Sequence, residues 1–150
     1  HDRLESHLQS LGLQTRVRAD ASQPGDTGYY CIFRLPESSG GEAKRIQTGR
    51  AVAQWLADWQ LRPWFLHDFE VHVYYNIQPL VAKLPLPDGG PWAYPENAFH
   101  DQYGYEKGTL PQLDQWLTSS VGIHVPSKLT TTQESAIMAA LDEMYATFFA

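Results

Sequence analysis

The chain has 150 residues, of which 43% are hydrophobic and 19% charged, and this suits one compact domain with a buried core. The net charge of −6 argues against a general nucleic-acid-binding protein, because such a protein needs a basic face to displace counterions. No apolar run approaches the roughly 20 residues that a membrane span requires, so we expect no membrane-embedded segment.

The first half of the chain alternates helical and strand patterns. Leu4, Leu8 and Leu11 recur at helical spacing, and Gly12 follows them as a C-terminal cap. Pro63 ends a second amphipathic pattern, and the turn formers SQPGDTG separate two alternating stretches. The predicted elements are a helix over residues 2–11, strands over 13–18 and 29–35, and a helix over 45–60.

The second half contains one long segment without regular structure. Residues 85–108 are rich in proline and glycine, and loops of this length in compact domains are usually functional or interface-bound. Thr131 with Glu134 fits a capping box that begins the last helix. The predicted elements are a strand over 69–75, a short helix over 77–83, a helix over 110–117, a strand over 120–125 and the final helix.

Short strands mixed with amphipathic helices indicate an α+β, two-layer domain. Helices are expected to cover one face of a small sheet. The sequence contains no internal repeat and no low-complexity tract, so we expect residues 1–150 to form a single domain.

The densest group of metal-binding side chain types is His67, Asp68, Glu70 and His72. On a strand, Asp68, Glu70 and His72 would project from one face and His67 from the other, so only part of the set can converge. The pattern is typical of a solvated strand face. A substrate contact by His72 and a metal site remain alternatives.

The other candidate groups do not form an active site. Cys31, the only cysteine, allows no disulfide, lies within an alternating strand as an inert thiol would, and favours a cytoplasmic setting. His124 has no identifiable partner base or nucleophile. The chain has no nucleophile elbow, no GxGxxG and no P-loop, and none of its four lysines lies in a buried pattern. We therefore predict no catalytic residue in this chain.

Three stretches resemble the C-terminal part of the DegT/DnrJ/StrS family of sugar aminotransferases. The resemblance covers most of residues 28–148. The stretches are YYCIFRLP (29–36), EVHVYYNIQPLVAK (70–83) and YGYEKGTLPQLDQWLTSSVGIHVPSKLTTTQESAIMAALDEM (103–144).

The resemblance implies a C-terminal small domain of a fold-type I enzyme that depends on pyridoxal phosphate. Such a domain has a small, mostly antiparallel sheet with helices packed on one face. The large domain of the parent enzyme would supply the Schiff-base lysine and the other cofactor-binding residues, so no cofactor is expected in this chain alone. The cofactor would transfer an amino group from glutamate or glutamine to a keto-sugar or keto-cyclitol.

The resemblance also assigns roles to individual residues. His72, Tyr74 and Asn76 match the family stretch that lies near the substrate, and Arg62 and Trp64 are secondary candidates. The alternative is that all five pack the sheet or a dimer interface.

The expected partners are the large domain and a sugar or cyclitol substrate, and a homodimer with a second copy stays open as an alternative. Two other functions stay open at this point. One is a binding or dimerisation module without catalysis. The other is a small metal-dependent enzyme that uses the ligands of residues 67–72.

Overall fold

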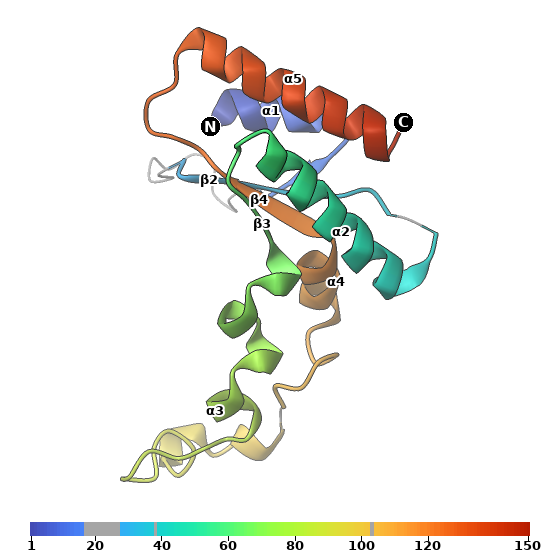
Figure 1. Ribbon diagram of the computed structural model, residues 1–150. Helices are drawn as coiled ribbons and strands as arrows, with labels where there is room; N and C mark the ends of the chain where they lie inside the picture. The colour runs from blue at the N-terminus through green and yellow to red at the C-terminus, as the bar shows by residue number, and fades with distance from the viewer. Residues whose placement is uncertain (17–27, 38, 103) are drawn as a thin grey trace.

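The computed structural model describes residues 1–16, 28–37, 39–102 and 104–150 (Figure 1). Residues 17 and 18 of the first predicted strand, and most of the loop predicted over 22–28, lie outside the described residues. The helices and strands are α1 (Asp2–Ser10), β1 (Gln14–Thr15), β2 (Tyr30–Arg34), α2 (Gly41–Asp58), β3 (Pro63–Phe65), α3 (Gln78–Val81), α4 (Pro111–Ser119), β4 (Ser120–His124) and α5 (Thr131–Phe148).

The four strands form one antiparallel sheet in the order β1-β2-β4-β3. The long central pair runs from Tyr30 opposite His124 to Arg34 opposite Ser120. Strand β3 lies on the other side of β4, with Trp64 opposite Gly122. Helix α4 passes directly into β4, so the position of the helix and the register of the central strand are fixed together.

The core lies on one face of the sheet. Cys31 and Phe33 of β2 and Val121 and Ile123 of β4 are almost completely buried on this face. Helices α1, α2 and α5 cover it with their apolar stripes, and the main contributors are Leu4, Leu8, Val52, Leu56, Leu141 and Met144. The prediction of an α+β domain, with an antiparallel sheet and helices on one face, is therefore confirmed. Among the described residues, no helix is both long enough and apolar enough to cross a bilayer.

Residues 66–110 leave the sheet after β3 as a projecting arm and return to it at α4 (Figure 1). The arm descends through three short 3-10 helices, η1 (Leu66–Asp68), η2 (Glu70–His72) and η3 (Tyr74–Asn76), before α3. Within the described residues 85–102 and 104–108, only two further 3-10 turns interrupt the irregular course that the sequence predicted.

The strand predicted over residues 69–75 is wrong. The backbone N–H of His72 donates to the Phe69 carbonyl at 2.9 Å, and that of Val73 donates to Glu70 at 3.1 Å. These are the i to i+3 bonds of 3-10 turns. The backbone of this segment is therefore satisfied within its own turns and not by a neighbouring strand.

Strand β3 was not predicted, because Pro63 was read only as the end of the preceding helix. Pro63 instead begins β3 at the edge of the sheet, where a residue without an N–H group is tolerated. That helix itself extends from Gly41 to Asp58 rather than from 45 to 60.

The capping box of α5 lies one residue before the predicted position. The Gln133 backbone N–H donates to the Thr130 hydroxyl at 3.2 Å, and the Thr130 N–H donates to the Gln133 side chain at 2.9 Å. Glu134, which was predicted to close the box, forms an ion pair with Arg3 of α1 at 3.0 Å. The final helix therefore begins one residue earlier than the predicted box implies, at Thr131.

Candidate functional site

The face of the sheet opposite α1, α2 and α5, which we call the open face, is the main candidate site. Side chains alternate between the two faces along a strand. The residues next in sequence to the buried core residues of each strand therefore point to the open face. From the strand registers, the open face consists of Gln14, Tyr30, Ile32, Arg34, Trp64, Ser120, Gly122 and His124.

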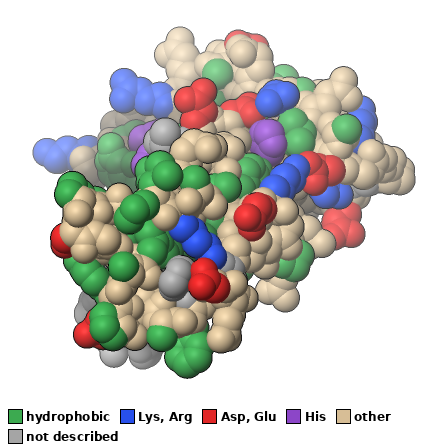
Figure 2. All heavy atoms as spheres, turned by 90° about the horizontal axis from the view of Figure 1, so that it is seen from below, with side chains coloured by type: hydrophobic (Ala, Val, Ile, Leu, Met, Phe, Trp, Pro, Cys, Tyr) green, Lys and Arg blue, Asp and Glu red, His purple; other side chains and the backbone are tan. Residues whose placement is uncertain are grey.

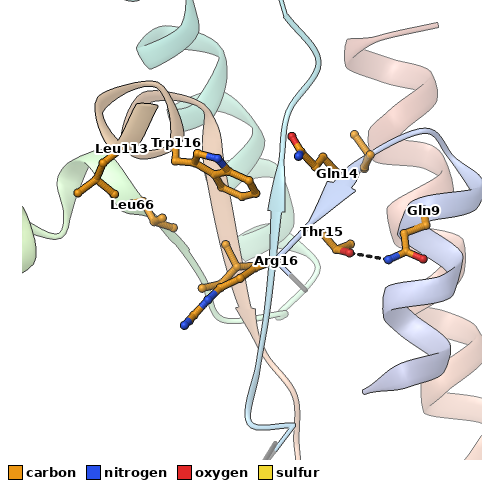
Figure 3. Close-up of a pocket in the computed structure, with 9 residues that line it drawn as sticks. Gln9, Gln14, Thr15, Arg16, Leu66, Leu113 and Trp116 are labelled. Atoms are coloured by element: carbon orange, nitrogen blue, oxygen red, sulfur yellow. Dashed lines mark hydrogen bonds between the residues drawn. The ribbon is translucent and has the colours of Figure 1, made fainter. Parts of the chain in front are cut away.

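A cavity of about 710 Å³ lies at the β1 edge of the sheet and extends onto one half of the open face (Figure 3). Leu66, Leu113 and Trp116 gather on one side of β2, while Gln9 and Gln14 lie on the other. The remaining lining residues are Leu13, Thr15, Arg16 and Ile32. The volume is in the range of small-molecule pockets, which measure roughly 300–1,000 Å³.

Two arginines near this cavity, Arg34 and Arg16, differ in their contacts. Arg34 donates from Nε to the Ser119 hydroxyl at 3.1 Å and pairs with Glu37 at 3.3 Å, while its guanidinium lies 6.0 Å from the Trp116 ring centroid. Arg16 lines the cavity on the same side of β2 as Leu66 and Trp116, with its guanidinium directed away from the indole (Figure 3). The Arg16 side chain forms no ion pair or hydrogen bond with any residue that the structure describes.

A second, smaller cavity of about 300 Å³ lies over the other half of the open face. Its walls are Tyr30, Arg62, Pro63, Trp64, Phe69 and His124. The His124 ring meets Tyr30 edge-on, with centroids 4.9 Å apart, and also lines a third cavity of about 570 Å³ between α2 and α5. His124 is therefore packed among aromatic rings, with access to two cavities.

Trp64 and Arg62, the secondary candidates from the resemblance, both line the smaller cavity. The Trp64 indole lies against Gly122 and stacks on Phe69 with centroids 5.3 Å apart. Its buried Nε1 has no hydrogen-bond partner among the residues that the structure describes. Arg62 adopts a left-handed backbone conformation (φ 44°), which is strained for a residue with a side chain and which turns the chain into β3.

The predicted substrate contacts His72, Tyr74 and Asn76 lie on the arm and do not converge. His72 stacks on Phe69 with centroids 4.6 Å apart. The Tyr74 hydroxyl donates to the Glu106 carbonyl and accepts from the Leu110 N–H, both at 3.3 Å. The Asn76 amide donates to a carbonyl of η2 at 3.1 Å. None of the three lines any of the three cavities, and their contact with a substrate remains a prediction.

The metal-binding candidates are held by other contacts. The Asp68 carboxylate accepts two hydrogen bonds from Arg50, at 2.7 and 2.8 Å, and lies 3.0 Å from His67 Nδ1. The hydrogen bonds from Arg50 lower the pKa of Asp68 to about 2. Among the residues that the structure describes, no three His, Cys, Asp or Glu side chains gather as a metal site would require.

The structure also gives Cys31 and Lys107 surroundings in which neither side chain is a nucleophile. Burial raises the pKa of the Cys31 thiol to about 12, which keeps it protonated and unreactive at neutral pH. Lys107 pairs with Glu42 of α2, and this pair links the returning part of the arm to the helix layer. Hydrogen bonding to Glu42 raises the pKa of Lys107, so its amine is charged and not available as a nucleophile.

Arg16, Ile32 and Trp116, the residues that define the large cavity, were not predicted as site residues. One signal for them was present in the sequence. In the alternating stretch 29–35, Ile32 occupies the side that was expected to face solvent, between Tyr30 and Arg34. An apolar residue at such a position indicates that something packs on that face.

Searches of protein-family models, curated proteins and solved structures found no match for this chain.

Proposed function

We propose that this chain is the small domain of a pyridoxal-phosphate-dependent aminotransferase that acts on a keto-sugar or keto-cyclitol. The observation that supports the proposal best is the one-sided sheet, in which three helices cover one face and the other carries two cavities. A domain built this way suits the wall of a cleft whose opposite wall comes from a second domain.

Exposed aromatic side chains at the edge of the open face support docking against another surface. Tyr29 and Tyr30 are 51% and 46% exposed, and they adjoin Trp64 and His124. A contiguous apolar surface of this kind on a monomer usually marks an interaction or ligand site. The open face is therefore the surface that we assign to the large domain and its substrate.

The cofactor itself is proposed for the large domain only. A pyridoxal phosphate pocket needs a lysine for the Schiff base and a carboxylate for the pyridine nitrogen. None of the described residues that line the three cavities is Lys, Asp or Glu. The residues present do not fit the cofactor, so the role proposed for this chain is to shape the substrate side of the cleft.

The test is to express the complete reading frame that contains this chain beside residues 1–150 alone. We expect the complete product to take up pyridoxal phosphate, with the absorbance of an internal aldimine, and to transfer an amino group from glutamine to a keto-sugar. Residues 1–150 alone should show neither property. An aldimine band in the isolated chain, or a complete product without cofactor binding, would contradict the proposal.

A dimerisation module is the second candidate, and the arm favours it. Leu86 and Phe99 are 61% and 65% exposed, and hydrophobic side chains cover much of the arm where it projects toward the viewer in Figure 2. Sedimentation velocity over a concentration series tests this role. A wild-type dimer that Phe99→Asp converts to a monomer would favour it, whereas a monomer at all concentrations would exclude it.

A further inference from the structure

We infer that the 710 Å³ cavity on the open face binds a small aromatic carboxylate, with Arg16 holding the carboxylate and Trp116 contacting the ring. This inference does not depend on the aminotransferase proposal. It concerns residues of this chain alone and needs neither a cofactor nor a second domain.

The charge of the lining selects a ligand with a single negative charge. Arg16 is the one charged residue among the described lining residues, and no carboxylate faces it across the cavity. A guanidinium binds a carboxylate through two parallel hydrogen bonds. A phosphate would carry more charge than one guanidinium balances, and the described lining contains no lysine and no second arginine.

The remaining lining divides into an apolar wall and a polar wall. Leu66, Leu113 and Trp116 form the apolar wall, and Ile32 contributes from the sheet. An indole edge beside aliphatic side chains suits a planar ring, because aromatic pairs gain energy beyond the area they bury. Arg34 over the Trp116 ring holds the indole in place and is itself satisfied by Ser119 and Glu37.

The polar wall adds hydrogen-bonding groups without adding charge. Gln9 is held in place by the bond from its amide to the Thr15 hydroxyl at 2.7 Å, while Gln14 lies on the open face at the edge of the sheet. A ligand with its ring against Trp116 and its carboxylate at Arg16 therefore leaves the polar edge of the cavity to water.

The experiment compares two probes of almost the same shape, 1-naphthaleneacetate and its neutral amide. Binding to the 150-residue chain is measured by isothermal titration calorimetry at low ionic strength. Because Arg16 is exposed, we expect the acid to bind about fivefold more tightly than the amide, which is the scale of a solvent-exposed ion pair. Added salt should reduce this ratio.

Three variants complete the test. Arg16→Gln should bring the ratio of the two affinities to about one. Arg3→Gln, the matched control on the exposed side of α1, should keep the wild-type ratio. Leu113→Asp should weaken both probes, since it places a charge on the apolar wall at an exposed helix position.

Three results would overturn the inference. They are binding of neither probe, equal binding of acid and amide by the wild type, and an unchanged ratio in Arg16→Gln. None of these results bears on cofactor uptake by the complete product, so failure here and failure of the aminotransferase proposal are distinguishable. Circular dichroism of each variant confirms that a lost signal does not reflect unfolding.

Discussion

Replacing Gly122 with alanine tests how Trp64 is seated on the sheet. A Cβ atom at this position would lie 2.4 Å from Cε2 and Cζ2 of the Trp64 indole, far inside van der Waals contact. The indole has little room to move away, because Phe69 stacks on it with the ring centroids 5.3 Å apart. We expect Gly122→Ala to lower the free energy of unfolding by about 1–3 kcal/mol, the usual cost of overpacking.

Introducing Gly122→Ala into a Trp64→Ala chain separates the clash with the indole from other causes of destabilisation. In a Trp64→Ala chain the space beside Gly122 is empty, and alanine is more favourable than glycine inside a strand by about 0.5–1 kcal/mol. Gly122→Ala should therefore stabilise that background instead of destabilising it. Urea unfolding followed by far-UV circular dichroism measures all four chains of the cycle.

The critical result is that Gly122→Ala changes the free energy of unfolding in opposite directions in the wild type and in the Trp64→Ala chain. If Gly122→Ala is neutral in the wild type, or if its cost is the same in both backgrounds, then Trp64 does not pack against the sheet as described. A cost that disappears only partly would mean that the neighbouring strands also resist the added methyl group.

Three further predictions follow from single contacts. The pKa of Asp68 is lowered to about 2, so its ion pair with Arg50 stabilises the fold above a pH of about 4 and is lost as the pH falls through 2. Because both groups are largely exposed, urea unfolding of Asp68→Asn should show a loss below about 1 kcal/mol at neutral pH, and the loss should vanish at acid pH. Cys31 should resist iodoacetamide at mildly alkaline pH and react once urea unfolds the chain; labelling of the folded protein, followed by mass spectrometry, would contradict its burial. Thr130→Ala should cost about 1 kcal/mol as the loss of a helix cap, whereas Thr131→Ala should be close to neutral, and equal midpoints in urea would show that the cap is misplaced.

The helices were predictable because their signal is local. Leu4 and Leu8 of α1, and Ile137 and Leu141 of α5, recur at the spacing that places them on one helical face, and all four are buried. The core face of β2 was equally predictable from the alternation of apolar and polar residues, since Cys31 and Phe33 are buried while their neighbours are not.

The arm was not predictable in the same way. Residues 69–75 alternate as well as β2 does, yet they form 3-10 turns. An alternating segment becomes a strand only if a neighbouring strand pairs with its backbone, and these residues instead form hydrogen bonds within their own turns. No pattern within the segment itself records which of these two kinds of hydrogen bonding forms.

The sequence by itself determined the α+β class of the fold, with amphipathic helices that bury one face of a small sheet. Those features follow from periodicities that each segment carries alone. Only the tertiary structure decided that Arg16 and Trp116 line one cavity, because they are brought together by the pairing of β1 with β2 and by the passage of α4 into β4. Contacts between residues so distant in the chain depend on strand order and register, which no local pattern encodes.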